Sequence, residues 1–67
     1  MMPPEMRFFI YLVEYYAKAK NISGKQVLEL FNRLDITRLV YDMYDIYHVE
    51  RLENAFADID KLILERA

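Results

Sequence analysis

The segment from Pro4 to about Lys20 is apolar over most of the circumference that a helix would give it. Polar positions recur along it at i, i+4, i+7 and i+11, one narrow stripe of a helix with 3.6 residues per turn: Arg7, Tyr11, Glu14 and Lys18. Pro4 suits a first helical position, because an N–H there has no intrahelical partner. The pattern predicts a first helix that is either central to a bundle or buried against another chain.

A second helix is predicted from about Gly24 to Arg33. The sequence Ser-Gly-Lys-Gln at its start has the form of a capping box. In such a box the Ser23 hydroxyl accepts from the Gln26 backbone N–H, and the Gln26 side chain accepts from the Ser23 backbone N–H. The predicted core face of this helix consists of four apolar positions: Val27, Leu30, Phe31 and Leu34.

A third helix is predicted from about Ile36 to His48, with Asp35 or Thr37 as its N-cap. Its polar positions again form a narrow stripe: Arg38, Asp42 and Asp45. Apolar and polar residues do not alternate strictly every second position, so the segment fits a helix better than a strand.

The chain then becomes strongly charged, and residues 49–57 fit either a helical turn or an extended piece. A final helix is predicted after them, capped by Asp58 or Asp60, with Ile59, Leu62 and Ile63 on its apolar side. The predicted fold is therefore a single all-α domain over residues 1–67. It is a compact bundle of three to four short helices whose middle pair resembles a helix-turn-helix.

Composition narrows the function classes. The 67 residues are 55% hydrophobic, with six tyrosines and four phenylalanines, which is more apolar material than so small a sphere readily encloses. No cysteine is present, so disulfides and thiolate zinc sites are excluded. The net charge of −2 predicts no binding to a nucleic-acid backbone or a membrane. The longest apolar run, Phe8 to Val13, is too short to span a bilayer, and no signal peptide is recognisable, so we expect a cytoplasmic protein.

Three stretches, Ile22–Phe31, Tyr41–His48 and Asp58–Ile63, together resemble a small, uncharacterised bacterial domain family found mostly in gut Firmicutes. Its marks are the Ser-Gly-Lys cap, a Tyr and a His four residues apart, and Asp-Ile-Asp near the end. This chain has Val49–Arg51 where the family has Thr and then Gly. The family has no known function, so the resemblance implies no catalytic residues. Its members are often encoded beside toxin-like ADP-ribosyltransferase genes, which implies a partner or antitoxin role.

His48 is the one histidine and the first candidate for chemistry. As a general base it would need a pocket and a second polar group, which Tyr44 or Asp45 could supply. The alternative, which we favour, is that His48 ends the third helix and meets its unpaired carbonyls.

The acidic side chains offer a second candidate. Oxygen ligands suit Mg²⁺ or Ca²⁺, but the four carboxylates in the middle of the chain lack the density and the glycine turn of such sites: Asp42, Asp45, Glu50 and Glu53. Solvated or capping roles explain these residues, and the Asp58 and Asp60 pair, better. The Ser-Gly-Lys sequence also lacks the second glycine of a phosphate-binding loop. We therefore predict neither a metal, nor a cofactor, nor an enzyme.

The functional prediction is a protein–protein interaction module that self-associates, with a dimer as the first expectation and a cognate partner encoded nearby. The surplus of tyrosine carries it, since tyrosine is enriched at interfaces. Each ring could instead belong to the core or its rim. The predicted interface residues come from the first and third helices: Phe9, Leu12, Tyr16, Tyr44 and Tyr47. The alternative is a DNA-binding regulator that uses the second and third helices, although two carboxylates on the wet face of the third would repel phosphates.

Overall fold

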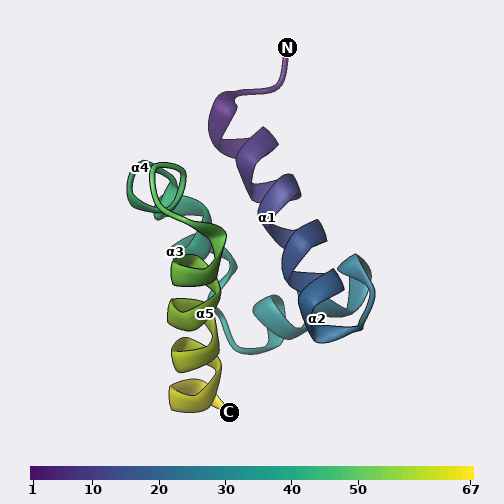
Figure 1. Cartoon of the computed structure of the whole chain (residues 1–67). Coiled ribbons are helices and arrows are strands. Elements are labelled where there is room, and N and C mark those ends of the chain that lie inside the picture. Colours follow the sequence, from purple (N-terminus) through teal and green to yellow (C-terminus); the bar gives the residue numbers. More distant parts are fainter.

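The computed structural model describes residues 1–67 and is entirely helical. Figure 1 shows α1 and α5 running beside each other, with α2 at the far end of α1 and α3 and α4 beside α5. The five helices are α1 (Pro4–Lys20), α2 (Gly24–Arg33), α3 (Thr37–Asp42), α4 (Tyr44–Tyr47) and α5 (Leu52–Arg66). The all-α prediction is therefore confirmed. None of the helices combines the length and the apolarity needed to cross a membrane.

The predicted bounds of α1 are confirmed, and its end has a local cause. Asn21 adopts the left-handed conformation at φ 59°, which asparagine tolerates better than most residues. The chain then turns back, and the Ile22 N–H donates to the Ala17 carbonyl at 3.0 Å. That bond satisfies one of the carbonyls that the helix end would leave unpaired.

The capping box at the start of α2 is confirmed. The Gln26 N–H donates to the Ser23 hydroxyl at 3.1 Å, and the Ser23 N–H donates to the Gln26 side-chain oxygen at 2.9 Å. These two bonds satisfy donors that have no intrahelical partner. Gly24 keeps the junction narrow, because a Cβ there would lie 3.1 Å from the Glu14 carboxylate of α1.

The third predicted helix is wrong in its continuity and in its cap. The chain breaks at Met43, whose N–H bonds three residues back to Val40 rather than four, and α3 and α4 lie on either side. The residue before α3 is Ile36, and neither Asp35 nor Thr37 caps the helix. Asp35 takes a left-handed turn at φ 59° instead. Aromatic and β-branched residues have modest helix propensity, so packing decides the path of this segment.

The final helix begins earlier than predicted. It starts at Leu52, with Arg51 before it, so Asp58 and Asp60 lie inside α5 and cap nothing. The charged residues at its start are good helix formers, and Ala55 and Ile59 fall on one buried face four residues apart. The missed signal was this apolar spacing, which extends back through the charged run.

Twelve residues from all five helices and the turn before α3 form the core. α1 contributes five of them: Phe9, Leu12, Val13, Tyr16 and Ala17. The other seven surround this stripe: Val27, Phe31, Ile36, Val40, Tyr47, Ala55 and Ile59. No polar or charged residue is fully buried with them. The core therefore depends on α1, whose buried side the four other helices cover.

Loss of the capping box should weaken the whole domain measurably. We predict that Ser23→Ala lowers the free energy of unfolding by about 1 kcal/mol, because an N–H in the first turn of α2 loses its partner. Chemical denaturation followed by far-UV circular dichroism measures this. Ser23→Asp keeps an acceptor at the same place and should retain most of the stability, and an equal loss in both variants would contradict the capping role.

Candidate functional site

Four of the five predicted interface residues lie in the core of the single chain. Phe9, Leu12, Tyr16 and Tyr47 are at most 8% exposed, and Tyr44 is half-buried. A surface that meets another molecule has to draw mainly on other side chains.

A row of exposed and half-buried rings lies where α1 meets α4. Five rings follow one another in contact across the two helices, and we call this set the aromatic strip: Tyr15, Tyr11, Phe8, Tyr44 and His48. Ring centroids are 4.6 Å apart between Tyr15 and Tyr11, 6.2 Å between Tyr11 and Phe8, and 5.7 Å between Phe8 and Tyr44. These spacings are typical of favourable aromatic pairs.

The spacing of the rings in the sequence places them on one flank of their helices. Phe8, Tyr11 and Tyr15 are three and four residues apart in α1, so they share a face. Tyr11 and Tyr15 remain 46% and 44% exposed. The sequence interpretation singled out Tyr11 and Tyr44 but missed the strip, because nothing local indicates that α4 continues the row beyond Phe8.

His48 stacks on Tyr44 with ring centroids 4.2 Å apart and planes 7° from parallel. Its Nδ1 lies 2.6 Å from the Tyr44 carbonyl oxygen. A carbonyl only accepts, so Nδ1 carries the proton in this contact. His48 follows the last residue of α4, and its prediction as a helix-ending residue is confirmed. Histidine and tyrosine four residues apart therefore form one stacked, hydrogen-bonded unit.

Charged side chains of opposite sign occur near the aromatic strip. The Lys18 ammonium lies 5.2 Å from the centroid of the Tyr15 ring, a cation–π contact at one end of the strip. Asp45 is next to Tyr44 in the sequence of α4 and is exposed.

A polar contact on the other side of α1 joins it to α5. The Tyr16 hydroxyl donates to Asp60 at 2.5 Å, and the Lys20 ammonium donates to the other Asp60 oxygen at 2.9 Å. Partial burial of Asp60 opposes its charge, but the bonds from Tyr16 and Lys20 prevail and lower the pKa of Asp60. Asp60 was predicted to cap a helix or to be solvated, and it instead ties the first helix to the last.

Two buried tyrosines have raised pKa values. Burial, then the hydrogen bond to Asp60, raises the pKa of Tyr16 well above its usual range. Burial, followed by the charge of Asp58, raises the pKa of Tyr47 to about 12. In both cases a phenolate would lie in apolar surroundings beside a carboxylate, so the neutral phenol is favoured.

The exposed side of α3 carries an ion pair. On α3 the Arg38 guanidinium is paired with Asp42 through contacts of 3.1 and 3.2 Å, and both side chains are more than half exposed. α3 itself is only six residues long. Nor do three or more histidine, aspartate or glutamate side chains gather anywhere in a way that could hold a metal ion.

Residues 7–66 match the model of a protein family described as a protein of unknown function, DUF3791. The chain belongs to the DUF3791 family. The match covers the whole aromatic strip and all five helices, except residues 4–6 at the start of α1. Comparison of this DUF3791 chain with curated proteins and with solved structures gave no match.

The buried phenols predict that this DUF3791 domain loses stability in alkali. A group with a raised pKa in the folded state contributes stability that is complete below its unfolded pKa, about 10, and is lost as the pH rises towards the folded pKa. Each such tyrosine should lower the free energy of unfolding by about 1.4 kcal/mol per pH unit in that window.

Denaturation midpoints measured from about pH 9 to about pH 12, the range around the tyrosine pKa, test this. Tyr47→Phe should flatten the pH dependence, whereas Tyr11→Phe on the surface should leave it unchanged. If the wild type and Tyr47→Phe lost stability equally as the pH rises, the Tyr47 phenol would not be a cause of the loss.

Proposed function

We propose that this chain is a non-catalytic protein–protein interaction module that self-associates through the aromatic strip. The contiguity of the strip is the observation that supports this. The Tyr11 and Tyr15 rings pack against each other at a tilt of 50°, while nearly half of each residue remains exposed. Tyrosine rings bury a large area on binding at a low cost in side-chain entropy, and their hydroxyls tolerate water at the rim.

The opposite charges of Lys18, at one end of the strip, and of Asp45, beside Tyr44 in the sequence, favour a second copy of the chain as the partner. In a two-fold symmetric dimer the same surface patch meets itself, so one end of the strip lies opposite the other. An antiparallel pairing would bring Lys18 of one copy towards Asp45 of the other, twice per dimer. Such pairs fix the register of an interface more than they add to its affinity.

We further propose a cognate partner encoded beside this gene, which the module would restrain in the manner of an antitoxin. The bacterial family that the chain resembles supplies this part of the proposal, through its frequent neighbourhood with toxin-like ADP-ribosyltransferase genes. Co-expression with the adjacent gene product, scored by co-purification, tests it. The DNA-binding alternative is less well supported, because Arg38 is already paired with Asp42 and the net charge of the chain is −2.

Sedimentation equilibrium tests self-association directly. We predict a dimer at micromolar concentration, twice the 8.1 kDa of one chain. Replacing both exposed rings, by Tyr11→Ala with Tyr15→Ala, should weaken dimerisation by about a hundredfold, since truncated interface tyrosines commonly cost more than 1 kcal/mol each. Leu28→Ala removes an exposed side chain of similar accessibility on α2 and is the matched control.

Exchanging the two charges distinguishes the proposed pairing of Lys18 with Asp45 from non-specific hydrophobic association. Lys18→Glu should weaken the dimer, and adding Asp45→Lys should restore it, because the pair is rebuilt with reversed signs. A wild-type chain that sediments only as a folded monomer would overturn self-association. A dimer that is insensitive to the two tyrosines would overturn the strip as its surface.

A further inference from the structure

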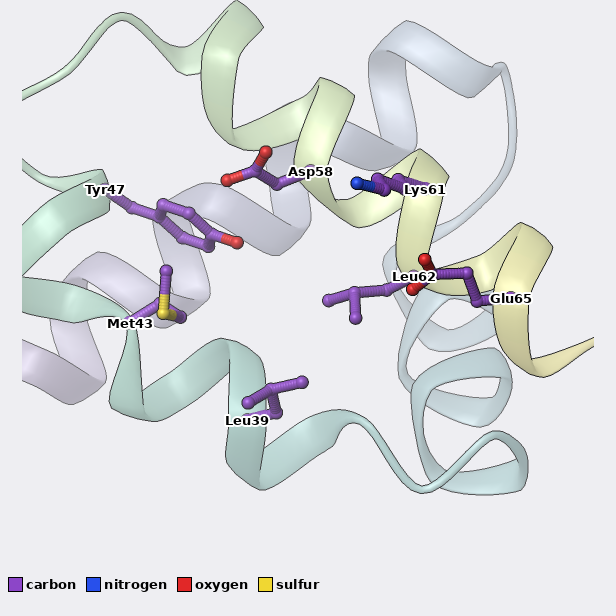
Figure 2. Close-up of a pocket in the computed structure, with 7 residues that line it drawn as sticks. All are labelled: Leu39, Met43, Tyr47, Asp58, Lys61, Leu62 and Glu65. Atoms are coloured by element: carbon purple, nitrogen blue, oxygen red, sulfur yellow. The ribbon is translucent and has the colours of Figure 1, made fainter.

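A cavity of about 280 Å³ opens between the middle helices and α5. Figure 2 shows its walls, with α3 and α4 on one side and α5 on the other. Its lining combines apolar and charged side chains: Leu39, Met43, Tyr47, Asp58, Lys61, Leu62 and Glu65. None of these residues belongs to the aromatic strip, so the site is separate from the proposed interface.

The apolar part of the lining could receive an aliphatic chain. Leu39 and Met43 contribute from one wall and Leu62 reaches across from the other, as Figure 2 shows. Leu39 is 40% exposed, and covering it together with its neighbours would remove apolar surface from water. This part of the cavity selects for a ligand with methylene groups.

The Tyr47 side chain brings one polar group to this lining. The residue is only 1% exposed, yet its hydroxyl points into the cavity towards the space between Asp58 and Leu62 (Figure 2). Burial raises the pKa of Tyr47, and Asp58 raises it further through its charge and as a hydrogen-bond acceptor for this hydroxyl. The phenolic oxygen still has lone pairs with which it can accept from a ligand that carries several donors.

The charges of the cavity come from one face of α5. Asp58, Lys61 and Glu65 are three and four residues apart, and none of them forms an ion pair at contact distance. Two carboxylates against one ammonium leave this wall with a net negative charge. A ligand with a positive group is therefore favoured over a neutral or anionic one.

We propose that this cavity binds a guanidinium group carried on an aliphatic stem. The stem would lie on Leu39, Met43 and Leu62, while the guanidinium faces the Asp58 and Glu65 carboxylates and the Tyr47 phenol. A guanidinium fits better than an ammonium because it is planar, offers several donors to carboxylates and is more weakly hydrated. Two sources share this chemistry, an arginine side chain of another protein and a free alkylguanidine.

Nuclear magnetic resonance titration of the full chain with n-butylguanidinium tests the proposal, with N-butylurea as the neutral ligand of the same shape. We expect n-butylguanidinium to shift the methyl signals of Leu39, Met43 and Leu62 with a dissociation constant of about 1 mM, typical for so few ligand atoms. N-butylurea should bind far more weakly. Equal shifts with both ligands, or none with either, would overturn the proposal.

Variants on the surface of α5 test the charged wall while leaving the core intact. Asp58→Asn and Glu65→Gln should each weaken n-butylguanidinium binding by about tenfold, whereas Lys61→Gln should strengthen it by removing a like charge. Glu29→Gln on α2 makes the same change outside the cavity and should have no effect. Binding that falls equally in Glu29→Gln and Asp58→Asn would contradict a local site.

The two sources are distinguished with a capped Gly-Arg-Gly peptide and its citrulline counterpart. Binding of the arginine peptide at these methyl groups, and not of the citrulline peptide, identifies a protein side chain as the fitting ligand. Binding of n-butylguanidinium alone identifies a small free guanidine. Both results support the guanidinium site, and binding of the citrulline peptide as strongly as the arginine peptide overturns it.

Discussion

The structure depends on a single constraint, which is that α1 is apolar around most of its circumference and the chain has only four shorter helices with which to cover it. α2, α3, α4 and α5 cover one side of α1, and five residues there become the centre of the core. The Tyr16 to Asp60 hydrogen bond then holds α5 against this side. The opposite flank keeps Tyr11 and Tyr15 at the surface, and this uncovered remainder is the basis of the proposed interface.

The part of the fold that could be predicted from the sequence is the part with local causes. α1 and α2 begin and end where the proline, the polar stripe and the Ser23 capping box indicate. The break at Met43 and the start of α5 at Leu52 have no capping side chain and no glycine. The break at Met43 results from the way distant segments pack, so no short window of sequence could locate it. For α5, the apolar spacing of Ala55 and Ile59 was the one local signal, and the charged residues around it obscured it.

The sequence predicted an aromatic surface but not which rings form it. The surplus of tyrosine pointed to aromatic surface on the first and third predicted helices, and the aromatic strip does join α1 to α4. Tyr16 and Tyr47 are buried while Tyr11 and Tyr15 are not, although all four are tyrosines in strongly apolar helices. Which ring is covered depends on where α5 and α4 lie, and the helical period of α1 alone does not contain that information.

The central proposal is that two copies of the chain meet at the uncovered flank of α1. Ring proton signals followed over a range of protein concentrations test it most directly, because each ring reports its own surroundings. We predict that the signals of Tyr11, Tyr15 and His48 shift as the protein is diluted, while those of the buried Phe31 stay constant. Constant signals from the aromatic strip over the same range would contradict it.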